Sequence, residues 1–414
     1  MRHLDDLDLT GRRVLLRADL NVPLEHPPGG PARVADDMRI RAALPTIEEL
    51  RGKGASIVLV SHLGRPRDRE PELSMRPVVE RLRELVDAPV TCADAVVGPS
   101  VQALAEGLRP GEILVLENVR YEHGELANDP AFASSLAALA DVYVDDAFGS
   151  AHRAHASTEG VAHLLPSAAG RLLQREVEVL TALQSDPPRP LVAVLGGAKV
   201  KDKIELVGRF LESADAVLIG GAMSFPFLAA LGHATGASLC AADDIPRARA
   251  ALERATGEQR RLRLPEDLVV ARKPEDFAVA RGPDADAETR ADAEPRAAAE
   301  IRTLSGVEVP DGWMGLDIGP HTAKRYAREI EAAATVFWNG PMGAFEHEPF
   351  AAGTRAVAHA LARNGGTTVV GGGETVEALR SFGLQDQVSH ISTGGGATLE
   401  LLSGRKLPGV EALD

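Results

Sequence analysis

Short runs of Val, Ile and Leu recur along the chain, separated by stretches with helical spacing, and this repetition limits the folds available to it. The runs do not alternate between apolar and polar residues, so they are typical of parallel strands buried on both faces. We expect such strands at 14–17, 56–61, 112–117, 142–145, 191–195, 216–219, 268–271, 335–338 and 367–370.

The intervening stretches predict helices at 38–50, 77–86, 132–139, 172–183, 204–211, 323–333, 356–363 and 376–381. Repeated strand–helix–strand units predict an α/β protein with two doubly wound, parallel-sheet (Rossmann-like) domains. We expect the break between them at 185–190, because the prolines there cannot continue the preceding helix. The segment 281–302 mixes Ala, Asp, Glu and Arg, and is expected to be a solvated, partly helical insertion.

The bulk composition excludes several classes of partner. The net charge of -15 argues against nucleic acid and against an anionic membrane. No apolar run is long enough for a transmembrane helix, and the polar start at 1–6 does not predict a secretory signal. Cys92 and Cys240 are the two cysteines, which favours packing residues in a reducing cytoplasm over a disulfide or a metal cluster.

In the N-terminal half, cationic residues follow the predicted strands. Ligands of open α/β sheets bind beyond the carboxyl ends of the strands, and guanidinium groups bind phosphate or carboxylate in a fork. The pattern predicts a site for a small, densely charged anion, made by His62 and by five arginines: Arg17, Arg39, Arg65, Arg120 and Arg153. The alternative, surface arginines in an Arg-rich chain, stays open for each one singly. Arg17 and His155 are expected to be structural.

In the C-terminal half, four glycine clusters each follow an apolar stretch, at 196–197, 220–221, 371–373 and 394–396. Glycine lets backbone N–H groups approach phosphate oxygens, and a following helix adds partial positive charge. Three of the chain's seven lysines lie at 199–203, and Lys199 and Lys203 would share one face of a helix. This spacing predicts an anion there. The alternative is a solvated helix start, with Lys203 paired to Asp202 or Glu205.

Motifs of several other enzyme classes are absent from the sequence. It contains no G-x-x-x-x-G-K-[ST], no G-x-G-x-x-G after a strand, no G-x-S-x-G and no histidine–cysteine cluster. We therefore expect chemistry by positioning and electrostatics, without a covalent intermediate or a structural metal.

Longer segments carry a family resemblance over nearly the whole chain. RADLNVP, SHLGRP, LENVR and DDAFGSAHRAH in the N-terminal half, and LGGAKVKDK, GWMGLDIGP, WNGPMGAFE, GGGET and STGGGATLELL in the C-terminal half, resemble motifs of the phosphoglycerate kinase family in the same order. The resemblance implies a monomeric, cytoplasmic phosphotransferase of glycolysis and gluconeogenesis with a carboxyl group as acceptor. It implies reversible, Mg2+-dependent phosphoryl transfer between ATP and 3-phosphoglycerate, giving ADP and 1,3-bisphosphoglycerate. It also implies a 3-phosphoglycerate domain at 1–185, a hinge, a nucleotide domain at 186–390, and a segment at 391–414 that packs back onto the first domain.

The resemblance also implies roles for particular residues. The positions that match the 3-phosphoglycerate site are Asp19, Asn21, Arg39, His62, Arg65, Arg120 and Arg153. Those that match the nucleotide site are Lys203, Gly220, Gly221, Gly315, Asn339, Glu346, Gly371, Gly372, Gly373, Glu374 and Thr375. The catalytic positions that face the transferred phosphoryl group are Arg39, Lys199, Gly372 and Gly395.

Two positions depart from the family pattern. Glu374 stands where the family has an aspartate that binds magnesium, and magnesium tolerates poor geometry badly. Asp145 stands where asparagine is more usual, and a structural effect is expected. Two alternatives to the kinase remain: a non-catalytic receptor for phosphorylated metabolites, and an enzyme of this fold with altered activity.

Overall fold

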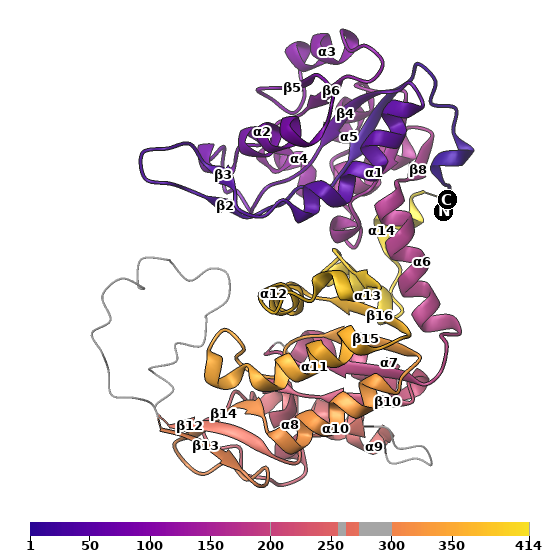
Figure 1. Cartoon of the computed structure of the whole chain (residues 1–414). Helices are drawn as coiled ribbons and strands as arrows, with labels where there is room; N and C mark the ends of the chain where they lie inside the picture. Colours follow the sequence, from indigo (N-terminus) through magenta and orange to yellow (C-terminus); the bar gives the residue numbers. More distant parts are fainter. Residues whose placement is uncertain (199, 256–261, 273–299, 414) are drawn as a thin grey trace. The chain divides into compact units, whose positions relative to one another are not determined.

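The structure is a computed structural model that describes residues 1–198, 200–255, 262–272 and 300–413, with only the backbone at 200–202. It forms two compact units (Figure 1). Unit 1 contains Met1–Thr181 and Gly396–Asp414, and unit 2 contains Ala182–Gly395. The chain passes from unit 1 to unit 2 within one helix, α6 (Arg171–Ser185), whereas sequence placed the boundary after residue 185.

Unit 1 is built on a six-stranded sheet of order β5-β6-β4-β1-β7-β8, whose pairings are parallel. Its strands are β1 (Arg13–Arg17), β4 (Ser56–Val60), β5 (Val90–Cys92), β6 (Ile113–Val115), β7 (Val142–Asp145) and β8 (Ser167–Ala169). A hairpin of β2 (Leu24–Glu25) and β3 (Arg33–Val34) follows β1. The helices are α1 (Met38–Gly52), α2 (Arg76–Leu85), α3 (Pro99–Glu106), α4 (His123–Leu126), α5 (Pro130–Ala137), α13 (Gly396–Leu402) and α14 (Pro408–Glu411), with most of α6.

Both faces of the sheet in unit 1 are buried. Val14 and Leu16 point to the face covered by α1 and α2, where Ile47 and Leu82 belong to the same core. Leu15, between them on the opposite face, is also fully buried. Successive strand residues point to opposite faces, so a strand buried on both sides needs a continuous apolar run. This requirement explains the non-alternating pattern in the sequence.

Unit 2 repeats the arrangement with a parallel sheet of order β11-β10-β9-β15-β16-β17. Its strands are β9 (Leu191–Leu195), β10 (Ala216–Ile219), β11 (Leu262–Arg263), β15 (Thr335–Asn339), β16 (Thr367–Gly371) and β17 (His390–Ile391). Its helices are α7 (Val200–Ser213), α8 (Ser224–Ala230), α9 (Ile245–Ala255), α10 (Pro320–Glu331), α11 (Ala352–Arg363) and α12 (Gly373–Ser381).

Alternate residues of β15 show that helices cover both faces of this second sheet. Val336 and Trp338 pack in the core formed with α10 and α11. Phe337 points the other way and stacks on Phe210 of α7, with 5.3 Å between ring centroids. Both large sheets are therefore of the doubly wound α/β type, and the predicted fold class is confirmed.

The prediction of a parallel strand at 268–271 is wrong. This segment lies in β12 (Leu268–Arg272), the centre of a small antiparallel sheet with β13 (Glu300–Leu304) and β14 (Trp313–Ile318). The apolar run reflects burial on both faces, since Val270 packs with Phe225 on one side and Ala271 packs with Phe350 on the other. The last residues of the segment 281–302 are exposed, as expected of a solvated segment, but they begin β13 and are not helical; the earlier part lies outside the described residues.

Candidate active site

A cluster of arginines lies at the carboxyl end of the sheet in unit 1. Arg39 is the second residue of α1, and its Nη1 donates to Asp19 Oδ1 at 2.8 Å. Burial would raise the pKa of Asp19, but the positive charges of Arg39 and Arg17 lower it, and the pKa lies below its usual value. The aspartate is therefore ionised and holds Arg39 in place.

Hydrogen bonds between loops fix the positions of the other members. The buried Asn118 accepts from Leu63 N at 3.2 Å and from Arg120 N at 3.1 Å, and it donates to Leu63 O at 2.7 Å. Asn21 Oδ1 accepts from Gly64 N at 2.8 Å, and Arg120 Nη1 donates to Gly64 O at 2.5 Å. The loops after β1, β4 and β6 are thus joined side by side, and each presents a predicted site residue.

The cluster is positively charged within an acidic chain. Burial, followed by the nearby charges of Arg153 and Arg17, lowers the pKa of Arg120 to about 10. Burial and Arg153 lower the pKa of His152 to about 4. Arg65 is exposed and has no ion-pair partner among the residues that the structure describes. Guanidinium groups this close repel one another, so the arrangement favours binding of an anion.

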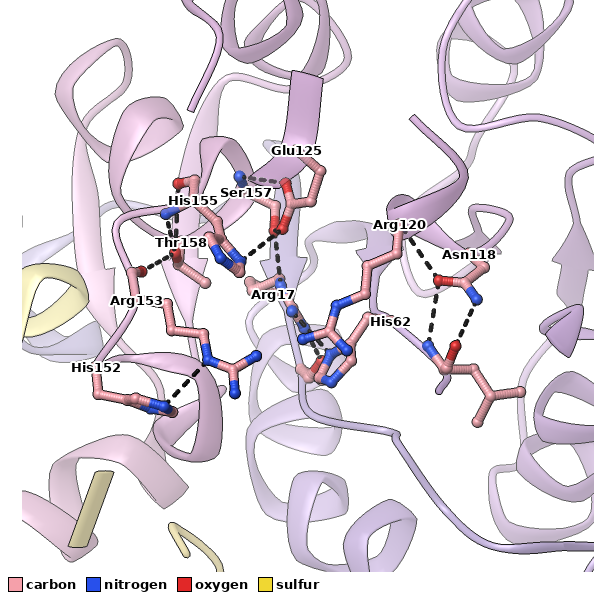
Figure 2. A network of polar contacts seen from close by, with 12 residues as sticks. Arg17, His62, Asn118, Arg120, Glu125, His152, Arg153, His155, Ser157 and Thr158 are labelled. Carbon is pink, nitrogen blue, oxygen red and sulfur yellow. Dashed lines mark hydrogen bonds and ion pairs between the residues drawn. The ribbon is translucent and has the colours of Figure 1, made fainter. Parts of the chain in front are cut away.

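We call the set Asp19, Asn21, Arg39, His62, Arg65, Arg120 and Arg153 the arginine site. Figure 2 shows how Arg17, His62, Arg120 and Arg153 lie around one region of unit 1. Through direct contacts or charge, the structure brings together Asp19, Arg39, His62, Arg120 and Arg153, while Asn21 and Arg65 flank Gly64.

Beneath the arginine site lies a buried polar network that sequence reasoning missed. Glu125, on α4, accepts from Ser157 Oγ at 2.7 Å and from Ser157 N at 2.9 Å. Ser157 lies in the π-helical turn Ala156–Gly160, and its Oγ accepts from Arg17 Nε at 2.9 Å (Figure 2). His155 Nδ1 lies 3.6 Å from Glu125 Oε1. Arg17 and His155, which were expected to be structural, both have partners in this network.

In unit 2, glycine loops surround one buried lysine. Lys203, on α7, donates from Nζ to Gly196 O at 2.7 Å and is 8% exposed. A Cβ on Gly340 would lie 2.2 Å from Gly196 O and 2.5 Å from Lys203 Nζ. The position of a Cβ on Gly197 lies 3.2 Å from Lys203 Nζ and 3.3 Å from Glu374 Oε2. Lys203, Glu374 and the backbone of the loops after β9 and β15 therefore meet.

An amide and a helix N-terminus face the same region. Asn339 ends β15, and within the described part of the chain its buried Nδ2 has no hydrogen-bond partner. That atom lies 3.0 Å from the position of a Cβ on Gly372, which precedes α12 with a φ of +91°. Thr375 Oγ1 accepts from Gly340 N at 2.7 Å. A free buried donor beside the first turn of a helix suits a phosphate oxygen.

An apolar pocket lies between β14 and α8. It is lined by Gly221, Ser224, Phe225, Leu268, Gly315, Leu316, Asp317, Ile318 and Met342. Gly315 leaves room for the Phe225 ring, because a Cβ there would lie 2.4 Å from Phe225 Cζ. Gly220 does not line the pocket, but it accommodates Met342, whose Sδ lies 2.4 Å from the position of a Cβ on Gly220. The walls of the pocket are apolar, but the space between them is about that of one water molecule, so a flat base would have to part them to bind there.

Few side chains are available to hold a metal. Among the described residues, no group of three or more His, Cys, Asp and Glu side chains is placed to bind one. Glu374 lies in the first turn of α12 beside Glu346, whose pKa is raised by burial and then by the charges of Glu374 and Glu377. A single carboxylate fits Mg2+ carried on nucleotide phosphates, since Mg2+ is commonly held by one or two carboxylates, phosphates and water.

Two of the predicted catalytic positions, Lys199 and Gly395, lie outside the regions described above. Lys199 lies outside the described residues. Gly395 is the last residue of unit 2, with a φ of +52°, and Gly394 N donates to Ser392 Oγ at 3.3 Å.

Comparison with known proteins decides the family. The profile of the family described as "Phosphoglycerate kinase" matches residues 4–405. The chain belongs to the phosphoglycerate kinase family. It is 51% identical to the phosphoglycerate kinase of Moorella thermoacetica over 411 residues, covering 99% of this chain and 98% of that protein. It is 50% identical to that of Rubrobacter xylanophilus over 413 residues, covering 100% and 98%.

Solved phosphoglycerate kinases share the architecture. The structure from Coxiella burnetii superposes with a TM-score of 0.82 at 37% identity, covering 99% of this chain and 97% of that one. The structure from Pyrococcus horikoshii gives 0.81 at 29% identity, covering 100% and 98%. Membership in this family makes the chain a phosphotransferase, as the sequence motifs predicted. None of the helices among the described residues is long and apolar enough to cross a membrane.

Proposed function

We propose that this kinase transfers a phosphoryl group reversibly between ATP and the carboxyl group of 3-phosphoglycerate, with Mg2+. The observation that carries the substrate assignment is the arginine site. Guanidinium groups are gathered there in a chain of net charge -15, and the charges of Arg153 and Arg17, together with burial, lower the pKa of Arg120. A small molecule with a phosphate and a carboxylate offers enough negative charge to neutralise them.

In the arginine site, Arg65, Arg120 and Arg153 would bind the substrate anion, with Asn21 as a further polar contact. Asp19 would orient Arg39, as the 2.8 Å contact supports. Arg39 would then face the carboxylate that accepts the phosphoryl group. The loops that carry these residues are cross-linked by Asn118 and Gly64, so binding requires little reordering.

In unit 2, the apolar pocket with Gly221 and Gly315 would take the adenine base, and Gly220 would shape it through Met342. Glu346 would accept from the ribose hydroxyls. Lys203, Asn339 Nδ2 and the α12 N-terminus, 371–375, would bind the phosphates. Mg2+, when bound to those phosphates, would neutralise part of their charge, and Glu374 would hold it directly or through water.

Transfer itself would depend on the groups around the moving phosphoryl group: the side-chain cations of Lys199 and Arg39, and the backbone N–H groups of Gly372 and Gly395. Such groups lower the barrier because the transition state spreads negative charge over the transferred oxygens. Water would have to be excluded to prevent hydrolysis of ATP, and we propose closure about a hinge between the two units for that purpose. We further propose a cytoplasmic, monomeric enzyme of glycolysis and gluconeogenesis.

The test is a coupled assay of 1,3-bisphosphoglycerate formation from ATP and 3-phosphoglycerate, with Mg2+ and then with Mn2+. Turnover with Mg2+ supports the proposal and shows that Glu374 serves in place of aspartate. Turnover with Mn2+ alone would overturn the Mg2+ assignment. Binding of both substrates without turnover would favour an altered activity, and binding of 3-phosphoglycerate without any binding of nucleotide would favour a receptor.

A further inference from the structure

The side chain of Arg17 lies at the base of the arginine site and is almost fully buried, with 1% exposed. Arg17 ends β1, the central strand beside β4 and β7. Its guanidinium makes three polar contacts: Nη1 donates to Ala18 O, Nε donates to Ser157 Oγ at 2.9 Å, and Nη2 lies 3.1 Å from His62 Nδ1. One arginine therefore connects the network beneath the site to a histidine of the site (Figure 2).

The contact with Arg17 determines the protonation state of His62. A guanidinium has five N–H donors, no acceptor, and stays protonated in proteins. His62 Nδ1 must therefore accept the hydrogen bond, and an accepting ring nitrogen carries no proton. The ring is then neutral, with its single proton on Nε2. Within the described residues, Nε2 has no hydrogen-bond partner, although the residue is only 4% exposed.

The surroundings of His62 also favour the neutral ring. Burial lowers its pKa most, and Arg17, Arg120 and Arg39 lower it further, while Asp19 alone among the facing charges raises it. The balance leaves the pKa well below its usual value. Three arginines and one aspartate face the ring, so geometry and charge point the same way.

Ser157 and Glu125 hold the arginine in this position. Ser157 donates to Glu125 from both its Oγ and its backbone N, and neither side chain is exposed. Tyr143 Oη donates to Ser157 O at 2.8 Å and fixes the turn from the other side. Because Ser157 Oγ donates its one proton to Glu125, its lone pair is left for Arg17 Nε. The buried carboxylate thereby balances the buried guanidinium through one hydroxyl.

We propose that Arg17, held by Ser157 and Glu125, is a positioning residue that keeps His62 as the neutral Nε2–H tautomer. His62 then presents one fixed donor, Nε2–H, to a carboxylate or hydroxyl oxygen of the substrate. This inference rests on the proposed binding of 3-phosphoglycerate at the arginine site. The histidine adds direction rather than positive charge, so its contribution to substrate binding is constant through neutral pH.

The first experiment reads the tautomer without substrate. The full chain is labelled with 15N-histidine, and long-range 1H–15N correlation spectra are recorded between about pH 5.5 and about pH 8. His62→Gln assigns the signal. We expect an unprotonated Nδ1, a protonated Nε2 and no titration across this range. A proton on Nδ1, or a titration near the ordinary histidine pKa, would overturn the proposal.

The second experiment loosens the arginine without removing it. In Ser157→Ala we expect mixed tautomers at His62 and a KM for 3-phosphoglycerate raised about tenfold, equal to about 1.4 kcal/mol, with the KM for ATP unchanged. Ser157→Thr keeps the hydroxyl and should restore the single tautomer. Ser150→Ala, at another buried serine of unit 1 outside the network, is the matched control.

Arg17→Met gives an independent arm if it folds, since His62 should then titrate with a raised pKa. Unchanged His62 signals in Ser157→Ala, even with lower stability, would show a merely structural serine and overturn the proposal. The spectra need no ligand. The spectra could show a single His62 tautomer while none of the substitutions changes the KM for 3-phosphoglycerate. That result would count against the proposed substrate, and not against the neutral Nε2–H form of His62.

Discussion

The two proposed binding regions would recognise anions by different physical means. The arginine site of unit 1 uses side-chain cations, aligned by buried partners such as Asp19 and Asn118. The proposed nucleotide site of unit 2, around Lys203 and the glycine loops, would use mainly backbone groups and the space that glycines leave, with one buried lysine among the described residues. A small acid with a phosphate and a carboxylate requires cations at fixed points, whereas a long nucleotide requires close approach of the backbone along its length.

The difference teaches where each region is fragile. In unit 1, a change of charge should weaken binding while the fold persists. In unit 2, a single added methyl group should disturb the fold itself. At several loop glycines, a Cβ would lie closer to a neighbouring backbone atom than van der Waals contact allows.

The largest effect is expected for Gly340→Ala in unit 2. Its φ is +97°, and the new Cβ would lie 2.2 Å from Gly196 O, a backbone atom that cannot rotate away. We expect a loss of at least about 3 kcal/mol in the free energy of unfolding of unit 2, from overpacking together with backbone strain. Urea unfolding measures it. Gly365→Ala, where a Cβ meets no atom within 4 Å, is the control. Equal stability of the two variants would contradict the steric account.

Next in size is the effect of Lys203→Met on nucleotide binding. A buried ammonium that hydrogen-bonds to Gly196 O is already desolvated, so its interaction with a phosphate is strong. We expect ADP affinity to fall by about 3 kcal/mol, with 3-phosphoglycerate affinity unchanged, in calorimetric titrations. Lys324→Met, at an exposed lysine of the same unit, should alter neither. Loss of affinity for both ligands would contradict the proposal that each region binds its own ligand.

Arg65→Ala should give the reverse pattern. Arg65 is an exposed cation at the end of the loop fixed by Gly64. Its loss should weaken 3-phosphoglycerate binding by about 2 kcal/mol, the scale of a charge-assisted hydrogen bond, and leave ADP affinity unchanged. Arg67→Ala, two residues along the same loop, is the control. If both variants bound 3-phosphoglycerate as the parent does, Arg65 would be an ordinary surface arginine.

The smallest effect concerns pH. Asp145 is fully buried, and its Oδ2 has no partner among the residues described. Burial, opposed by the Ala147 N–H and by Arg17, raises the pKa of Asp145 to about 7. Because the pKa is higher in the folded state, the protonated carboxyl makes its full contribution to stability below the pKa of the unfolded chain, about 3.9. That contribution is lost as the pH rises through about 7.

Asp145→Asn should therefore stabilise unit 1 by at least about 1 kcal/mol at about pH 8.5 and change little at about pH 4. Thermal unfolding at the two pH values measures this, with exposed Asp68→Asn as the control. The same gain at both pH values would assign the effect to packing rather than to charge.

The parallel sheets were predictable because burial on both faces leaves a local mark in the sequence. The antiparallel β12 left the same mark, since its two faces are also buried, and no local signal records strand direction. Edge strands such as β17 (His390–Ile391) are too short and too exposed to leave one.

The residues proposed to contact a ligand were easier to recognise in the sequence than the residues that support them. The arginines follow strands, so their location could be inferred from the sheet. Glu125 and Ser157 lie close to recognisable motifs, but they are 32 residues apart, and their burial depends on packing of the π-helical turn against α4. A lone glutamate in a polar stretch gives no sign that it is fully buried.

The chain leaves unit 1 once, at Thr181, and returns at Gly396, and both ends lie in unit 1, where Arg2 N donates to Leu413 O at 2.9 Å (Figure 1). During synthesis from the N-terminus, unit 1 is therefore begun first and completed last. Every residue of unit 2 has been made while α13 and α14, which contact the turns Phe148–Ser150 and Ala156–Gly160 of unit 1, are still absent. We expect the growing chain to contain a complete unit 2 and an incomplete unit 1 until residues 396–413 have been made.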